Sequence, residues 1–361
     1  MNVSFLKNLK AVHKVIRDLR LRSNEGVMWN DRVKEHIKKQ NLKFDKTVFL
    51  YLLTFKIVPL VGLPFYIYHS EFTWGPWVTM TILYFLTGMS ITIGYHRLFA
   101  HRAFKANPWI EKALLFFGAL SLQNSCLKWS SDHRTHHSYT DTDRDPYNAK
   151  LGFWWSHIVW IFYTPRENRY VKNNDVSIDI LKEEFPNCQD LIKNPRVLKQ
   201  HLYGHKLGLL SNFFIVAVLG LLFKDFWGYL LIGGFLRIVL VHQVTFCINS
   251  IAHMFGDTPH SEEHTAKDSF YCAILTFGEG YHNFHHTFPN DYRCGTSLHH
   301  ADISKWVIYG WSKVGLAWDL KRTPKSKYLT QSKEEITASM GMKPLAAESF
   351  NNKDIKVTKP V

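Results

Sequence analysis

Four apolar runs, each long enough to cross a bilayer, constrain the fold of this chain more than any other feature. They cover residues 47–68, 77–95, 207–223 and 226–248. A helix of about 20 residues spans the hydrocarbon core of a membrane. Eight residues separate the first two runs, and only Lys224 and Asp225 separate the last two. Such short links join antiparallel neighbours, so the sequence predicts an all-α integral membrane protein with four transmembrane helices in two hairpins.

The distribution of charge predicts the orientation of these helices. The formal net charge is +14, and the basic residues lie in the N-terminal segment and in the long segments 96–206 and 249–361. The positive-inside rule therefore places both termini and both long segments in the cytosol, where they form a helical cap. In a chain with such apolar runs, excess positive charge indicates a membrane surface or an anionic substrate rather than nucleic acid. The short aromatic stretches 108–122 and 151–163 are expected to be helices at the membrane interface.

The two ends of the chain differ in composition from the middle. Residues 1–46 carry twelve Lys or Arg against five acids, and apolar residues from Leu6 to Leu19 recur at helical spacing. An interfacial helix and a basic tail without fixed structure are both open interpretations. No apolar core follows the basic residues, so a secretory signal is not expected. Residues 325–361 are polar and Lys-rich, which predicts a disordered tail. Residues 47–324 are expected to form one domain.

Histidines gather in three clusters beside the apolar runs. The second and third clusters read HxxHH, and residues at i, i+3 and i+4 share one face of a helix. Converging neutral imidazoles need partners, and a transition metal is the natural one. The eight histidines are His96, His101, His133, His136, His137, His282, His285 and His286, and His253 in NSIAH is a candidate ninth. One metal takes about five or six ligands at most, so the clusters predict a two-metal centre.

The residue types favour iron over zinc. Structural zinc sites usually use cysteine and close at about four ligands, whereas the five cysteines of this chain are scattered and form no CxxC pair. A histidine-rich pair of metals suits iron and O₂ chemistry. Acids near the clusters either hold the second ring nitrogen of a ligand histidine or serve as surface and turn residues. They are Asp132, Asp141, Asp143, Asp145 and Glu279.

Three residues inside the apolar runs are further candidates. His242 lies within a run, where an ionisable group marks either a functional site or a hydrogen bond to a neighbouring helix. Gly88 precedes His96 by eight residues, about 12 Å along an α-helix at ~1.5 Å per residue. Gly88 and nearby Tyr84 are therefore predicted to face the metals. A glycine there either leaves room at the end of a buried tunnel or permits close helix packing.

Longer motifs resemble the membrane fatty acyl desaturases of the stearoyl-CoA (delta-9) type. The resemblance covers about residues 47–322 and rests on HRLFAHRAFKA, DHRTHHSYTDTDRDPYNAKLGFWWSH, NSIAH, GEGYHNFHHTFPNDYR and SKVGLAWDLKR. It implies a four-span fold with a cytosolic cap, two iron ions, and the endoplasmic reticulum membrane as location. It also implies an enzyme that uses O₂ and two electrons to place a cis double bond in a saturated fatty acyl-CoA.

The resemblance also assigns individual residues. It implies that all nine histidines bind metal: His96, His101, His133, His136, His137, His253, His282, His285 and His286. By the same comparison Asn249 holds a metal-bound water, and Asn124 and Asp132 contact the head group of the substrate. Phe246 stands where the family has a tunnel tryptophan. Gly88 and Tyr84 complete the set of expected substrate contacts.

Two departures from the family pattern concern the carrier and the electron donor. Ser131 replaces an arginine, and Thr164 and Pro165 replace a basic pair used for CoA phosphates, although Arg166 and Arg169 are near. A glycerolipid or sphingolipid carrier, or hydroxylation as the outcome, therefore stays open. The third cluster begins with His282 rather than the glutamine of front-end desaturases, and the chain contains no His-Pro-Gly-Gly haem motif. Electrons are then expected from a separate cytochrome b5 and its NADH-dependent reductase.

A membrane metal transporter is the alternative from a different class. Transporters place their ligands near the bilayer midplane within the spans. The histidine clusters of this chain follow the spans instead, which disfavours transport.

Overall fold

Four helices of the computed structural model are long and apolar enough to cross a membrane, as expected from the sequence. The model describes residues 30–165 and 177–328. The candidate spans are α3 (Lys46–His69), α4 with its continuation (Gly75–Ala100), α10 (Pro195–Leu222), and α11 to α12 (Phe226–Met254). The third helix begins at Pro195, well before the predicted start at residue 207, because Asn194 caps it and Pro195 occupies its first position.

Two of the spans contain π-helical segments. α4 (Gly75–Met89) continues as η2 (Ser90–Ala100), and α11 (Phe226–Gly228) continues through η7 (Tyr229–Leu236) into α12 (Arg237–Met254). π-Helices are rare and occur often at functional sites. The predicted distance from His96 to Gly88 assumed an α-helix throughout and is therefore wrong, because residues 90–96 are π-helical. Gly88 and Tyr84 nevertheless border the same cavity as His96.

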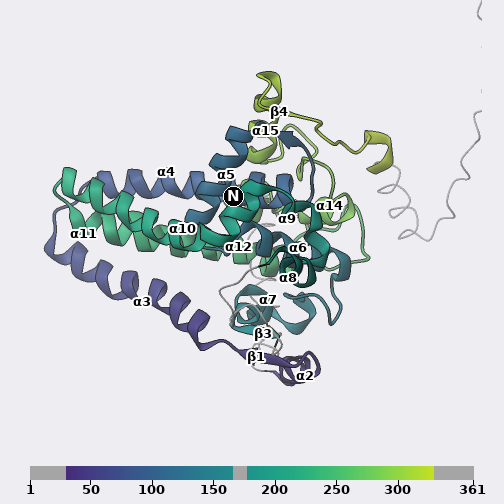
Figure 1. The fold of residues 1–361 in the computed structure, drawn as a ribbon, viewed down its shortest axis with the longest axis horizontal. Helices are drawn as coiled ribbons and strands as arrows, with labels where there is room; N and C mark the ends of the chain where they lie inside the picture. The colour runs from purple at the N-terminus through teal and green to yellow at the C-terminus, as the bar shows by residue number, and fades with distance from the viewer. Residues whose placement is uncertain (1–29, 166–176, 329–361) are drawn as a thin grey trace, which may run out of the picture. The chain divides into compact units, whose positions relative to one another are not determined.

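The shorter elements between residues 30 and 322 gather at one end of the long helices, and we call them the cap (Figure 1). Its helices are α2 (Asp31–Lys39), α5 (Pro108–Leu120), α6 (Cys126–Tyr139), α7 (Phe153–His157), α8 (Ile178–Glu184), α9 (Gln189–Ile192), α13 (Phe270–Leu275), α14 (His282–Thr287) and α15 (Ile303–Lys313). Three 3₁₀ turns join them: η3 (Ala149–Leu151), η4 (Val159–Phe162) and η6 (Pro186–Cys188). The expected helix over 108–122 is confirmed. The single helix expected over 151–163 is wrong, because the backbone turns at Ile158 between α7 and η4.

Two short antiparallel pairs connect distant parts of the cap. β1 (Leu42–Phe44) pairs with β3 (Tyr163–Pro165), and β2 (Lys105–Ala106) pairs with β4 (Ala317–Trp318). α2 and β1 show that part of the N-terminal segment has a fixed structure, which the sequence did not predict. The helical stripe over residues 6–19 and most of the expected disordered tail lie outside the described residues. The chain up to Arg322 forms one compact unit, and the residues from Thr323 onward belong to a second one.

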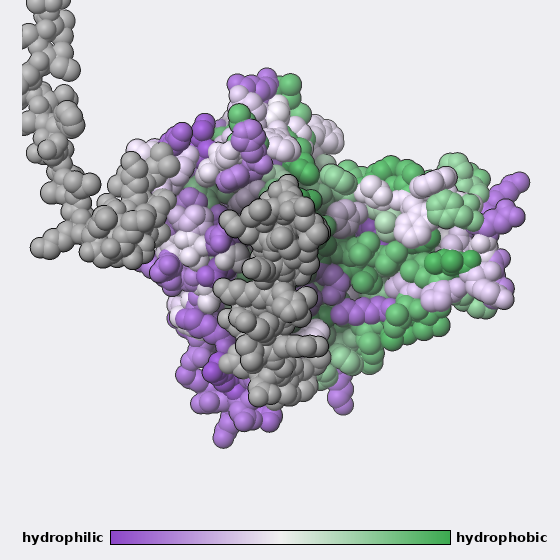
Figure 2. Space-filling model, turned by 180° about the vertical axis from the view of Figure 1, so that it is seen from behind, coloured by the Kyte–Doolittle hydropathy of each residue, from purple (hydrophilic) through white to green (hydrophobic). Residues whose placement is uncertain are grey.

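The hydropathy of the visible surface separates the long helices from the cap. Figure 2 shows hydrophobic residues over the long helices and hydrophilic residues over the cap. Large apolar side chains such as Leu60, Phe65 and Leu210 are more than half exposed on the long helices. Exposed apolar side chains at this density are typical of contact with lipid.

Candidate metal centre

Nine histidines converge in the cap from four elements of the chain. His96 lies in η2 and His101 directly follows it; α6, α12 and α14 supply the others. They form two groups, and within each group the ring nitrogens lie within 4.8 Å of one another. The first group is His96, His101, His133, His137 and His285, and the second is His136, His253, His282 and His286. The structure thus brings together all nine residues expected from the sequence.

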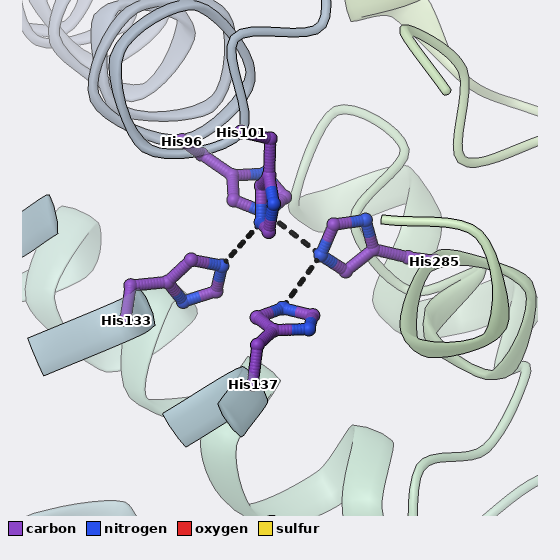
Figure 3. A group of neighbouring side chains, drawn as sticks. All are labelled: His96, His101, His133, His137 and His285. Atoms are coloured by element: carbon purple, nitrogen blue, oxygen red, sulfur yellow. Dashed lines mark hydrogen bonds between the residues drawn. The ribbon is translucent and has the colours of Figure 1, made fainter. Parts of the chain in front are cut away.

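The distances between these nitrogens match ligands of a shared ion. In the first group, the Nε2 atoms of His101 and His133 lie 2.8 Å apart, and Nε2 of His285 lies 2.9 Å from that of His96 and 3.0 Å from that of His137 (Figure 3). In the second group, the closest Nε2 pairs are 3.1–3.2 Å apart. At a metal–nitrogen distance of about 2.1 Å, ligands at right angles lie about 3.0 Å apart, and tetrahedral ligands about 3.4 Å. The ring nitrogens of each group are therefore close enough to bind one ion together.

Outer contacts orient the rings so that Nε2 faces inward. Nδ1 of His136 lies 2.8 Å from Oδ1 of Asp145, and Nδ1 of His96 lies 2.9 Å from Oε2 of Glu279. A carboxylate only accepts hydrogen bonds, so it keeps the ring proton on Nδ1 and leaves the Nε2 lone pair free for a metal. Nδ1 of His133 lies 3.1 Å from the Tyr147 hydroxyl, which orients this ring by a hydrogen bond that either atom can donate. Without a cation these converging lone pairs would repel one another.

Burial favours the neutral form of several of these rings. It lowers the pKa of six of these histidines well below the ordinary value, and the neighbouring rings lower it further; the six are His101, His133, His137, His282, His285 and His286. A neutral imidazole is the form that binds a metal. The two groups therefore offer nine imidazole donors and no thiolate, which fits a pair of transition metals and not a structural zinc site.

Local sequence explains why the rings meet. Ser125 caps α6 by accepting the N–H of Lys128, so its HxxHH histidines share one face. At the start of α14, Oδ1 of Asp268 accepts the N–H groups of Asn283 and Phe284. Burial raises the pKa of Asp268 to about 7. This carboxyl fixes the first turn of the helix that carries the third cluster.

The acids predicted near the clusters have different roles. Asp145 and Glu279 contact ligand histidines, as one of the two interpretations proposed. Asp141 reaches a ligand histidine only through Thr265. Its Oδ1 accepts a hydrogen bond from the Thr265 hydroxyl, whose oxygen lies 2.8 Å from Nδ1 of His253.

The other two acids form ion pairs away from the histidines. Asp143 pairs with Lys39, and Asp132 pairs with Lys128. A role in holding a ligand ring is therefore wrong for both.

A buried ion network behind the first group was missed by sequence reasoning. The Arg97 guanidinium, which is 1% exposed, contacts Glu279 at 2.9 Å and Asp302 at 3.0 Å. Burial opposes ionisation of Glu279, but Arg97 and His96 outweigh it and lower the pKa of this carboxyl. A charged residue directly after a ligand at the end of an apolar run was the available signal. The network fixes His96 through Glu279.

Two cavities meet at the histidines. The outer cavity, of about 410 Å³, has polar and charged residues such as Asn124, Lys128 and Asp132 in its wall. The inner cavity is narrow, about 40 Å³, and extends between α4 and α12, with Tyr84 and Gly88 in its wall. The two share wall residues, listed here in chain order: Trp129, His133, Tyr147, Thr245 and Asn249. The two cavities therefore adjoin beside the histidines, the outer one with polar and charged residues in its wall and the inner one with a largely apolar wall.

The predicted substrate contacts all border these cavities. Asn124, Asp132 and Phe246 border the outer cavity, Tyr84 and Gly88 the inner one, and Asn249 both. Their roles toward a substrate or a metal-bound water stay predictions. Tyr147, which contacts His133 and borders both cavities, was not predicted.

The intramembrane His242 takes part in a hydrogen-bond cluster. Its Nε2 lies 2.8 Å from the Ser121 carbonyl oxygen, and the fully buried Arg237 donates to the Leu120 carbonyl at 2.9 Å. These side chains satisfy the C-terminal carbonyls of α5 inside the apolar region, where an unpaired carbonyl would be costly. The hydrogen-bond interpretation of His242 is therefore confirmed, and the turn that it holds leads into Asn124.

Comparison with known proteins identifies the family. The fatty acid desaturase family model matches residues 72–305, which include all nine histidines. The chain belongs to the fatty acid desaturase family. A probable acyl-CoA desaturase of Schizosaccharomyces pombe is 36% identical over 317 residues, 85% of this chain and 63% of the relative. Acyl-CoA desaturase 1 of Saccharomyces cerevisiae is 41% identical over 240 residues, 66% and 44% of the two chains.

The matching desaturases differ in the carrier and the bond that their names give. The human stearoyl-CoA desaturase is 32% identical over 71% of this chain and 69% of its own length. The relatives also include an sn-2 palmitoyl-lipid 9-desaturase of a Nostoc species and an acyl-CoA Delta-12 desaturase of Tribolium castaneum. The chain spans less than two thirds of the length of the two yeast relatives. Membership thus gives the family, and the activity and the exact substrate need a separate argument.

Proposed function

We propose that this desaturase places a cis double bond at the delta-9 position of a saturated fatty acyl-CoA. The reaction uses O₂ and two electrons at a di-iron centre in the endoplasmic reticulum membrane, with both termini in the cytosol. The observation that carries the proposal is that the outer and inner cavities adjoin at the histidine groups. This arrangement suits a long molecule with a polar head, an apolar tail and a reacting segment between them.

Two iron ions fit the donor set. The first group would hold one ion through five imidazoles and the second would hold the other through four, and Asn249, which borders both cavities, would hold a metal-bound water. Bound iron supplies activation of O₂ and the oxidising power to break unactivated C–H bonds. The side chains of the protein keep the centre in place: Asp145 and Glu279 hold ligand tautomers, and Tyr147 supports His133.

The cavities explain how the position of the double bond would be fixed. The polar mouth of the outer cavity holds the carrier, and the apolar wall of the inner cavity holds the methyl end. The segment beside the wall residues shared by both cavities then lies next to the metals. The distance from the mouth to the histidines, counted in methylene groups, sets which bond reacts.

The mouth of the outer cavity supports a phosphate-bearing carrier such as CoA. Thr164 borders this cavity, and Lys43 lies directly opposite it in the β1–β3 pair. Residues opposite each other in an antiparallel pair share one face of the sheet. Among the described residues, Lys43 forms no ion pair and is exposed. The N-terminal strand thus supplies a cation where the family's basic pair is replaced by Thr164 and Pro165.

We expect Lys43→Glu to weaken use of stearoyl-CoA. Charge reversal beside the nucleotide phosphates should raise KM roughly tenfold at low ionic strength, and salt should reduce the difference. Stearoyl-pantetheine thioester, which lacks those phosphates, should show the same KM with both proteins. Lys34→Glu is the matched control, because Lys34 is an exposed lysine on α2 that pairs with Asp31. Equal effects on both thioesters would contradict a phosphate contact.

Electrons are proposed to come from cytochrome b5 and its NADH-dependent reductase. The donor would dock on the cap, where His137 and His286 are the two ligands that are not fully buried. Their rings stack at a centroid distance of 4.3 Å, one from each group. Both metals would therefore be reached from the same side.

Expression in a desaturase-deficient yeast tests the function. Fatty-acid analysis should show palmitoleic and oleic acids, and growth without added unsaturated fatty acids should be restored. Products with a delta-12 bond or a hydroxyl group would replace this proposal by another activity of the family. The absence of any new fatty acid, with the protein present in the membrane, would contradict it.

A further inference from the structure

The inner cavity borders Phe277, whose backbone has an unusual conformation. Phe277 lies in the loop between α13 and α14, is buried, and has φ +57°. Aromatic residues rarely adopt this left-handed region, and such residues persist only where the surroundings enforce them. Gly278 follows at φ +116°. Strained backbone positions of this kind are frequent at functional sites. The contacts of the Phe277 ring therefore indicate what the residue does.

The loop is anchored to the histidine centre. The Ser304 N–H donates to the Phe277 carbonyl at 3.2 Å, and the Gly278 N–H donates to the Ala273 carbonyl at 2.8 Å. A Cβ on Gly278 would lie 2.4 Å from Oδ1 of Asp302, so the loop packs directly on that carboxylate. The next residue, Glu279, contacts His96 and Arg97. The position of Phe277 is thus fixed relative to the metal ligands.

The ring of Phe277 fills a notch in α4. It packs against Tyr84 and Phe85 at centroid distances of 5.5 and 5.0 Å. A Cβ on Gly88 would lie 2.4 Å from its Cε2 atom, so even alanine at 88 requires the ring to move. Gly88 therefore makes room for Phe277 and not for the backbone of a neighbouring helix. Tyr84, Gly88 and Phe277 all border the inner cavity.

We propose that the Phe277 ring, seated over Gly88, is the stop that sets the longest acyl chain the enzyme accepts. The proposal rests on the proposed function, because it assigns the methyl end of the substrate to the inner cavity. That cavity is narrow, so a small displacement of one ring changes the length available to an apolar chain. The metal ligands stay in place, so chain length changes and bond position does not.

Substitutions on both sides of the contact test this pairing. Phe277→Ala should raise the preference for arachidoyl-CoA over stearoyl-CoA at least about tenfold, the discrimination that one or two methylene groups give in an apolar pocket. Phe277→Gly should do the same, and glycine suits the φ of this position. Gly88→Ala should displace the ring and shift use toward palmitoyl- and myristoyl-CoA. In the double variant Gly88→Ala/Phe277→Ala no ring remains for the alanine to displace, so its preference should equal that of Phe277→Ala, because residues in contact do not act additively.

Phe85→Ala is the matched control. Phe85 packs on the same ring but does not border either cavity. Its removal should leave the chain-length preference within about twofold of wild type, as for substitutions outside a binding surface. A shift as large as that of Phe277→Ala would show general loosening and overturn the proposal. Additive effects of Gly88→Ala and Phe277→Ala, or no shift in either, would overturn it as well.

Equilibrium binding of saturated acyl-CoA separates this proposal from the function. Calorimetric titration needs no turnover, and the Phe277 variants should gain affinity for arachidoyl-CoA relative to stearoyl-CoA. One outcome is that the wild-type protein binds stearoyl-CoA more tightly than arachidoyl-CoA, and the Phe277 variants reverse this, while no unsaturated product forms. In that case the proposed function fails and Phe277 still sets the chain length. Binding that ignores chain length in wild type and in the variants would overturn the role of Phe277.

Discussion

Replacing His136 with alanine should abolish desaturation, with a loss of roughly a thousandfold or more. Removal of a residue that only supports a ligand costs about 10–100-fold, and His136 is itself one of four rings in the second group. Its Nε2 lies 3.2 Å from that of His286, and Asp145 fixes its Nδ1. The variant removes one of the four rings of the second group, so the second metal should be lost before the first. Turnover and metal content of the purified variant measure this.

His264→Ala is the control for histidine content near the centre. The His264 ring lies 5.1 Å from the His286 ring, yet it belongs to neither group. We expect activity within about twofold of wild type, as for substitutions that remove no bond to the site. Full activity in His136→Ala, or equal losses in the two variants, would contradict the assignment of ligands.

Arg97→Met should strongly destabilise the fold as well as the centre. It leaves Glu279 and Asp302, both nearly fully buried, without their cation. Removing one partner of a buried ion pair costs about 3–5 kcal/mol, because the remaining charge stays uncompensated. For a domain of this size we expect the unfolding temperature to fall by roughly 10 °C or more. Thermal unfolding of the detergent-solubilised protein measures the change.

The matched control for Arg97 is Lys105→Met. Lys105 pairs with Asp319 at 3.1 Å, but the Lys105 side chain is 65% exposed. Exposed pairs contribute about 0–1 kcal/mol, so the unfolding temperature should change by a few degrees at most. If Arg97→Met and Lys105→Met unfold at the same temperature, the buried network does not support the cap as described.

Local patterns explain which parts of the structure could be predicted from the sequence. The four spans follow from apolar runs alone, since length and hydropathy are properties of single segments. The two HxxHH clusters follow from the helical repeat, because i, i+3 and i+4 share a face whatever the rest of the chain does. The number of histidines then predicted two metals. Each of these inferences needs only residues that are close in sequence.

What the sequence did not predict depends on partners far along the chain. Arg97 meets Glu279 and Asp302 some 180 to 205 residues later, and Lys43 meets Thr164 only through pairing of two short strands. Asp145 and Asp143 lie in one turn, yet one holds His136 and the other pairs with Lys39. Such choices depend on turn geometry and tertiary packing, which spacing does not encode.

The sequence patterns also did not predict two unusual backbone conformations. The π-helical winding of η2 brings His96 and His101 into one group, with the His101 N–H donating to the His96 carbonyl at 3.0 Å. A hydrophobic repeat does not distinguish this winding from an α-helix. The left-handed conformation of Phe277 is likewise set by its surroundings and not by residue preference.

The iron content of active protein tests the two-metal centre most directly. Metal-free protein should be titrated with ferrous iron while bound iron and desaturation of stearoyl-CoA, with cytochrome b5 and its reductase present, are followed together. Two groups of five and four histidines predict that activity rises until two irons are bound per chain and then stays constant. Full activity at one iron per chain would contradict a centre shared between the two groups.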